Sequence, residues 1–148
     1  MSSLNDLMTI TPYFPNPLII SLEEAKSYLN KLDLDYLIDT MCGEHYPLPR
    51  WTLADAKCAT HVYKNFLYLQ KKHFPFLLVP TREVDECWHN HILYTKNYFH
   101  DCYSIFGHYL HHQPASPSDN PNKLIEAFEK TKQLYLEEFR QSLFLVRI

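Results

Sequence analysis

Histidine is unevenly distributed along this chain. Nine histidines occur in 148 residues, and six of them fall between positions 89 and 112. Asp85 stands four residues before His89, so on a helix the two side chains lie one turn apart on the same face. A carboxylate beside an imidazole supplies either ligands for a metal ion or a charge-assisted hydrogen bond. The stretch 85–112 is therefore the strongest candidate for a functional site.

The His-x-His step at His89 and His91 poses a geometric problem. Two residues along a helix are about 200° apart, so these side chains diverge by about 160° and cannot bind one ion through bonds of about 2 Å. Either the two histidines have separate roles, or the helix breaks or bulges near Asn90. Without a break, the site needs a further ligand from the segment that follows Gly107, which contains a pair of histidines.

The candidate metal ligands are thus one carboxylate and four imidazoles: Asp85, His89, His91, His111 and His112. Two imidazoles and a carboxylate suit zinc with one coordination position open, or iron(II) as the second choice. Cys102 as a further ligand would favour a closed, structural zinc site. A zinc-bound water would have a pKa near 7, with Tyr94, Tyr98 or Asp101 as candidate proton carriers.

A metal-free interpretation of the same residues stays open. In it, Asp85 and His89 form a structural hydrogen bond, and the helix packs through Trp88. Whether the protein is an enzyme also stays open. The sequence contains no phosphate loop, dinucleotide fingerprint or serine elbow, so catalysis would be metal-dependent, as in a hydrolase or an oxygenase. The remaining histidines are expected to be solvated or isolated, although His61 could reach a site between helices: His45, His61, His73, His100 and His108.

Proline divides the chain into segments that can be helical. Ten prolines fall in four groups and leave proline-free stretches at 18–46, 50–74, 81–113 and 122–148. Apolar residues recur at helical spacing in these stretches, and no segment alternates with the period of a strand. The sequence predicts an all-α, single-domain bundle of four or five helices spanning 1–148, with an α/β fold as a poor second because of short apolar runs at 17–20 and 74–79.

Helix boundaries can be assigned from capping residues. Ser21 and Glu24 have the spacing of a capping box, and Thr52 and Thr81 are N-cap candidates for the second and third segments. Gly43 and Gly107 are the expected C-terminal ends of the first and third helices. Residues 144–148 could fray or extend the last helix.

Composition excludes several classes of protein. Fourteen basic and seventeen acidic side chains without a basic cluster give no electrostatic footprint for nucleic acid, so nucleic-acid binding is the third and weakest interpretation. No apolar run approaches the length of a membrane span, and the N-terminus lacks a signal pattern, so we expect a cytoplasmic protein with no membrane contact. Four cysteines without a CxxC pair are expected to be free thiols.

One stretch of the chain resembles a known family. The run V-P-T-R-E-V-D-E-C-W-H-N-H, followed by a tyrosine, an Asp-Cys pair, a glycine and L-H-H-Q-P, is similar to the glycine-rich domain-containing protein-like family over about positions 62–115. The pair of histidines in L-H-H-Q-P, His111 and His112, matches the bacterial style of the motif. The positions that match the shared motif are Asp85, Trp88, His89, His91, Tyr98 and Cys102.

The resemblance implies a mostly helical domain with a metal-binding site, and it names no reaction. Plant members carry a glycine-rich tail and are linked to stress responses and RNA association. This chain has two glycines, so those roles are not carried over.

Two hypotheses follow. The first is a small helical domain that binds one transition-metal ion, zinc in preference to iron, and meets a small-molecule substrate or an unknown protein partner. The second is a metal-free protein-interaction module in which the Asp/His cluster is a structural hydrogen-bond network.

Overall fold

The structure of the protein is a computed structural model that describes residues 17–143. Over those residues it contains six α-helices and no strand, which confirms the all-α prediction and exceeds the expected four or five helices. The terminal stretch 144–148 lies outside the described residues. The helices are α2 (Leu22–Lys31), α3 (Asp35–Cys42), α4 (Leu53–His73), α5 (Arg82–Leu93), α6 (Thr95–Phe106) and α7 (Pro121–Phe139).

The higher count arises because two of the expected helices are each divided in two. Leu32 adopts an extended backbone after α2, and Oδ1 of Asp33 accepts a hydrogen bond of 2.8 Å from the N–H of Asp35 at the start of α3. Tyr94, with φ −83° and ψ 71°, separates α5 from α6. Helix α5 runs through Asn90 without a break. The helix is interrupted only at Tyr94, after both histidines, so the interruption does not bring His89 and His91 together.

The capping predictions are confirmed. Ser21 and Glu24 form a full capping box, and the side chains of Thr52 and Thr81 accept hydrogen bonds from the N–H groups of the third residues of α4 and α5. Helix α6 ends at Gly107 in the left-handed conformation. Local sequence thus decides where most of the helices begin.

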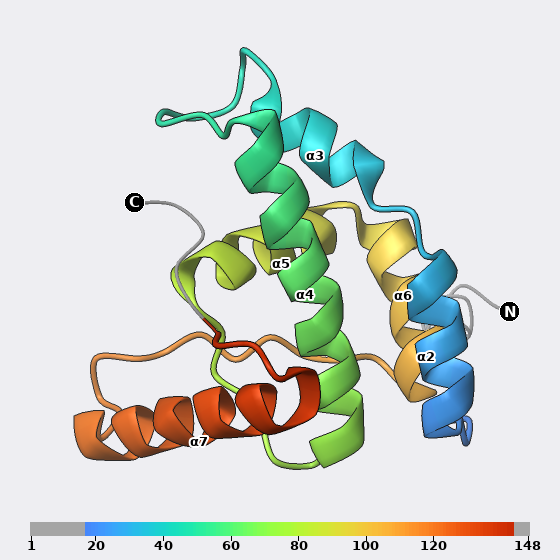
Figure 1. Cartoon of the computed structure of the whole chain (residues 1–148), viewed down its shortest axis with the longest axis vertical. Coiled ribbons are helices and arrows are strands. Elements are labelled where there is room, and N and C mark those ends of the chain that lie inside the picture. The colour runs from blue at the N-terminus through green and yellow to red at the C-terminus, as the bar shows by residue number, and fades with distance from the viewer. Residues whose placement is uncertain (1–16, 144–148) are drawn as a thin grey trace, which may run out of the picture.

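Helix α4 is the central element of the fold (Figure 1). Helices α2, α3 and α5 pack along it, α6 packs against α2 and α5, and α7 crosses its C-terminal half. Large apolar and aromatic side chains fill the space between the helices, among them Tyr63, Phe66, Leu67, Trp88 and Tyr98. None of the helices in the described part of the chain has the length and low polarity of a membrane span.

Gly107 fixes the turn that starts the loop toward His112. Its φ of +77° is in the left-handed region, and a Cβ at this position would lie 1.9 Å from the carbonyl oxygen of Leu18. We expect Gly107→Ala to lower the free energy of unfolding by at least about 1–2 kcal/mol, the cost of the left-handed backbone alone, as measured by urea denaturation.

Gly43→Ala is the matched control for this turn. Gly43 has φ −70°, and a Cβ there would meet its nearest atoms at 3.2 Å. The urea midpoint of the Gly43→Ala variant should fall less than that of the Gly107→Ala variant. Equal midpoints for the two variants would show that the turn does not depend on glycine.

The four cysteines are free thiols, as expected, and they divide by burial. Burial raises the pKa of Cys87 to about 12 and that of Cys102 to about 11. Because the thiolate is the reactive form, we expect iodoacetamide at pH 8 to modify Cys42 and Cys58 in the folded protein and the buried pair only after denaturation. Mass spectrometry of the labelled peptides measures this, and rapid labelling of Cys102 in the folded state would contradict its placement.

Candidate metal centre

Three of the predicted ligands meet at one point on the surface of the domain. Asp85 and His89 project from α5, one turn apart, and His112 reaches them from the loop after α6. The Nε2 atom of His112 lies 2.6 Å from Oδ1 of Asp85 and 3.0 Å from Nε2 of His89, which in turn lies 3.4 Å from Oδ2 of Asp85. One ligand atom from each residue lies within 4.8 Å of the other two.

His112 is held in place by its neighbours. Its ring stacks on the indole of Trp88, with centroids 4.0 Å apart and planes at 5°. The indole Nε1–H of Trp88 donates to the hydroxyl of Tyr98 at 2.8 Å, and that hydroxyl donates to the carbonyl oxygen of Leu110 at 2.5 Å. These two hydrogen bonds tie the loop to α5 and α6 two residues before His112. We call them the Trp88–Tyr98–Leu110 bridge.

The ring nitrogen Nε2 of His112 has two polar neighbours in this cluster. An imidazole nitrogen has either one proton or one lone pair in the ring plane, yet Nε2 of His112 faces both a carboxylate oxygen and a second ring nitrogen. If it carries a proton, that proton points at Asp85 or is shared between Asp85 and a lone pair on Nε2 of His89. If its lone pair accepts from His89, it faces the carboxylate oxygen at 2.6 Å.

A shared cation is a second way to satisfy these contacts, because all three atoms can be ligands at once. Ligands of a tetrahedral zinc ion, at about 2.0–2.1 Å from the metal, are about 3.3 Å apart. The observed separations of 2.6, 3.0 and 3.4 Å are close to that spacing. The residues present therefore fit a metal ion after small side-chain adjustments.

The three side chains of the cluster differ in their exposure to solvent. The side chains of His89 and Asp85 are 55% and 35% exposed, whereas that of His112 is 10% exposed. The second ring nitrogen of His112, Nδ1, is buried and has no hydrogen-bond partner among residues 17–143. Metal-bound histidines usually donate that second N–H to an acceptor, so here the stack on Trp88 is what sets the plane of the ring.

His91 lies away from the cluster, in the core. Its Nε2 is 2.8 Å from Oδ2 of Asp101, and its Nδ1 is 2.7 Å from the hydroxyl of Tyr63. The other oxygen of Asp101 accepts a hydrogen bond of 2.5 Å from Tyr28. Because Asp101 is an acceptor, Nε2 of His91 carries the proton and Nδ1 accepts from Tyr63.

This buried network is enclosed by the protein. The side chain of His91 is 1% exposed and that of Asp101 is 7% exposed. Burial raises the pKa of Tyr63 well above its usual value, and burial together with Asp101 raises the pKa of Tyr28 to about 12. Both ring nitrogens of His91 are engaged in hydrogen bonds. The network joins α2, α4, α5 and α6 and has a structural role.

The other histidine predictions have mixed outcomes. His111 is exposed, with its ring 4.9 Å from that of Tyr109, and it lies outside the metal-ligand group. His100 and His61 are exposed, as expected. His108 differs from the expectation of a solvated residue, because it is half-buried with its ring 4.8 Å from that of Phe74.

Other expected participants also lie outside the metal-ligand group. Cys102 is buried and is not among its members. Tyr94, one candidate proton carrier, shares a hydrogen bond of 2.6 Å with Thr40. Tyr98 and Asp101 belong to the bridge and to the buried network instead.

Sequence reasoning did not find the partners of these residues. Tyr28 and Tyr63 are far from Asp101 and His91 in sequence, and no local spacing links them. A cluster around Glu86, which accepts hydrogen bonds from Tyr46 and Trp51, was likewise not foreseen. The only sequence signal was the polar character of positions that the helical period places toward the core.

Comparison with known proteins shows the family of the chain. The family model described as UCP032817-like matches residues 24–137. Glycine-rich domain-containing protein 1 of Arabidopsis thaliana is 35% identical over 82 residues, which cover 52% of this chain and 10% of that much longer protein. No solved structure matches the chain. The chain therefore belongs to the UCP032817-like family, the glycine-rich domain-containing protein-like group that its W-H-x-H motif indicated.

Proposed function

We propose that this domain binds one transition-metal ion, zinc in preference to iron(II), through Asp85, His89 and His112. The observation that carries the proposal is the convergence of two ring nitrogens and a carboxylate, with one ligand atom of each within 4.8 Å of the other two. Zinc is favoured because divalent zinc binds a given set of nitrogen and oxygen ligands more tightly than iron(II).

Three protein ligands leave one tetrahedral position for another ligand. Since Asp85 and His89 are partly exposed, a water or substrate molecule can reach that position from solvent. Zinc held in this way would lower the pKa of a bound water to about 7, which is the chemistry of metal-dependent hydrolases, whereas iron(II) with two histidines and a carboxylate is typical of oxygenases. The four free thiols support a reducing, cytoplasmic setting.

Calorimetric titration of the metal-stripped protein with zinc tests the proposal. We expect one zinc ion per chain with a dissociation constant below about 10 μM, and weaker binding of iron(II) under anaerobic conditions. No saturable binding up to about 100 μM zinc would overturn it.

The alternative is a metal-free interaction module, and one observation favours it. His112 stacks on Trp88 and contacts Asp85 at 2.6 Å, so the cluster has structural contacts of its own. In that case chelators leave the melting temperature unchanged, and His89→Ala lowers it in metal-free protein. If His89 is a ligand, His89→Ala abolishes zinc-dependent stabilisation and leaves the metal-free melting temperature nearly unchanged.

The Trp88–Tyr98–Leu110 bridge makes a separate prediction about zinc affinity. Tyr98→Phe removes both hydrogen bonds of the hydroxyl and keeps the aromatic ring in the core. Loss of a direct hydrogen-bond partner of a metal ligand typically costs 10–100-fold in affinity; because Tyr98 acts on His112 only through Trp88 and Leu110, we expect a loss of up to about 10-fold, measured by competition with a chelator. Tyr103→Phe, on the same helix, is the matched control, and equal affinities in the two variants would show that the bridge does not position His112.

A further inference from the structure

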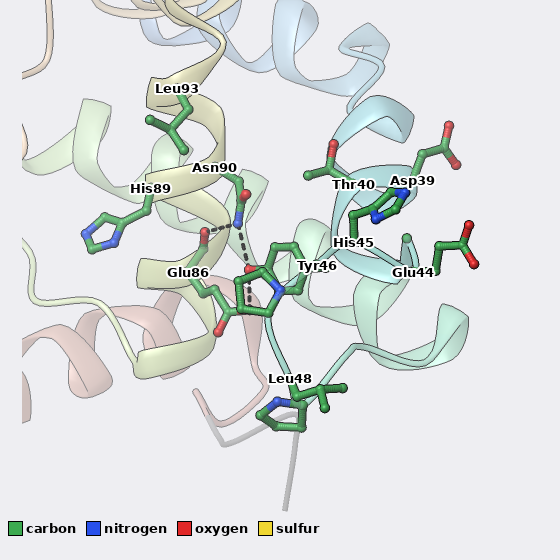
Figure 2. Close-up of a pocket in the computed structure, with 13 residues that line it drawn as sticks. Asp39, Thr40, Glu44, His45, Tyr46, Leu48, Glu86, His89, Asn90 and Leu93 are labelled. Carbon is green, nitrogen blue, oxygen red and sulfur yellow. Dashed lines mark hydrogen bonds between the residues drawn. The ribbon is translucent and has the colours of Figure 1, made fainter.

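Two of the larger cavities on the described part of the chain have different surroundings. One, of about 700 Å³, lies between the end of α3 and α5 and has His89 among its lining residues, so it adjoins the metal-ligand group (Figure 2). The other, of about 730 Å³, is lined by residues between 125 and 136 of α7 together with Ser142 and Leu143. We call it the α7 groove. Its lining includes no residue of the metal-ligand group or of the buried network.

Helix α7 packs into the domain with one face. Among the described helices it packs mainly against α4 (Figure 1), and its buried side chains are those of Thr131, Leu134 and Tyr135. At about 100° per residue, Ile125 and Leu136 point roughly 130–150° away from the centre of that buried face. They are 59% and 49% exposed. Two large apolar side chains therefore stand uncovered on the outer face of α7, one in each half of the helix.

The residues between these two side chains complete a regular stripe. Four residues follow one another at steps of four, three and four, and all of them line the α7 groove: Ile125, Glu129, Lys132 and Leu136. These steps are those of the a and d positions of a coiled coil, and they keep the four side chains within about 60° of one another on the helix. An apolar side chain stands at each end of the stripe, with an acid and a base in the middle. Such spacing is typical of a helix face that pairs with a second helix.

The order of the four residues makes the stripe complementary to itself. In an antiparallel pair of α7 helices with a two-fold axis between positions 130 and 131, Glu129 faces Lys132 of the second copy. Ile125 then faces Leu136 of the second copy, so each a position meets a d position. Glu129 and Lys132 of one chain are themselves paired at 2.8 Å, so four charges of alternating sign surround the axis. A parallel pair in register would instead place each charge against its own kind, which is unfavourable.

The flanks of the stripe agree with this pairing. Glu126 and Gln133 line the α7 groove beside the stripe, and in the antiparallel pair each comes opposite the other residue of the second copy. The carboxylate of Glu126 therefore meets an amide and not a like charge. Leu143, which is buried next to the groove, extends the apolar surface that receives Ile125 of the second copy.

We propose that the α7 groove is the surface through which two copies of this chain associate, with their α7 helices antiparallel. The occupant is a second copy because the sequence of apolar, acidic, basic and apolar positions is complementary to its own reverse. One helix from each copy makes an interface at the small end of the range, below about 1,200 Å². We therefore expect a reversible dimer with a dissociation constant of about 10–100 μM.

Sedimentation equilibrium of the full chain from about 5 to 500 μM tests the association. In the presence of EDTA, the weight-average mass should rise from that of one chain toward that of two, and no further, because a two-fold interface closes on itself. The same dissociation constant is expected with one equivalent of zinc. A mass that stays at one chain over the whole range, continued growth beyond two chains, or a dimer that forms only with zinc would overturn the proposal.

Charge reversal tests the antiparallel pairing. Glu129→Lys gives a stripe with two bases and Lys132→Glu gives a stripe with two acids, so each variant alone should dimerise at least about ten-fold more weakly. The double variant restores opposite charges across the axis, and its dissociation constant should return to within about three-fold of the original value. An equimolar mixture of the two single variants should form mixed dimers, since each stripe then opposes the other in charge.

Two further variants separate the groove from the rest of the surface. Ile125→Asp removes one apolar end of the stripe and should leave the chain monomeric up to about 500 μM. Glu44→Lys, in the exposed loop after α3, changes the net charge as Glu129→Lys does and should dimerise as the unmodified chain does. Circular dichroism shows that each variant keeps its helices. Variants of the stripe that all dimerise like the unmodified chain, or single variants that form no mixed dimers, would show that α7 is not the interface.

Discussion

Replacing His89 by alanine is expected to weaken zinc binding by more than about 100-fold while the domain stays folded. Loss of an outer partner of a metal site costs 10–100-fold, and loss of one of only three protein ligands should cost more. The side chain of His89 is 55% exposed, so its removal leaves the core intact. Competition with a chelator of known affinity measures the loss, and circular dichroism monitors the fold.

Two further variants keep this prediction specific. His112→Phe preserves an aromatic ring against Trp88 and removes the ring nitrogens. The zinc affinity of this variant should therefore fall to the same extent as that of His89→Ala. His111→Ala, at an exposed position next in the chain and outside the ligand group, should bind zinc as the unmodified protein does. If all three variants keep the affinity of the unmodified protein, Asp85, His89 and His112 are not the ligands.

Asp101→Ala is expected to be the most destabilising single change in the buried network. The carboxylate accepts hydrogen bonds from both Tyr28 and His91, and its side chain is 7% exposed. Its removal leaves two donors without their acceptor in a largely enclosed place, at about 1–3 kcal/mol for a buried group. Because Tyr28 is half-buried and can regain a water, we expect a total loss of about 2–4 kcal/mol.

Thermal unfolding measures this loss directly. For a chain of this size the melting temperature should fall by roughly 5–15 °C. Asp39→Ala, on the exposed face of α3, is the control and should change it by less than about 2 °C. Any folded fraction of Asp101→Ala should bind zinc normally, since the network and the metal site share no residue. A melting temperature equal to that of the control would show that the network does not hold the four helices together.

Local chemistry in the sequence predicted a large part of this structure. The capping residues Ser21, Thr52 and Thr81 mark true helix starts, because capping depends on neighbours within three positions. The spacing of Asp85 and His89 placed both on one helical face, and the paired histidines after Gly107 pointed to a loop that returns. Helical geometry left two possibilities for His89 and His91, separate roles or a break near Asn90, and in the structure the helix is unbroken there and the two have different partners.

What the sequence did not predict depends on contacts between distant segments. The breaks at Leu32 and Tyr94 contain neither proline nor glycine, so the helical period continued across them unmarked. The partners of His91 and of Glu86 come from other helices and from the loop before α4, and only packing brings them together. Which of His111 and His112 joins Asp85 was left open, and the stack of His112 on Trp88 shows which one does.

The W-H-x-H motif acquires a physical meaning from these positions. Its tryptophan stacks on His112, its first histidine lies beside Asp85 on the surface, and its second is fixed in the core by Asp101 and Tyr63. One short helix thus serves the metal-ligand group with one face and the buried network with the other. Mutation of the two histidines should therefore have different effects, on zinc for His89 and on stability for His91.

The metal content of the protein tests the central claim most directly. The full chain is expressed in zinc- and iron-supplemented medium, purified without chelators or a histidine tag, and measured by elemental analysis beside His89→Ala. We expect about one zinc ion per chain in the unmodified protein and almost none in the variant. An unmodified protein that carries no stoichiometric metal, or a variant that carries as much as the unmodified protein, would contradict a metal site at Asp85, His89 and His112.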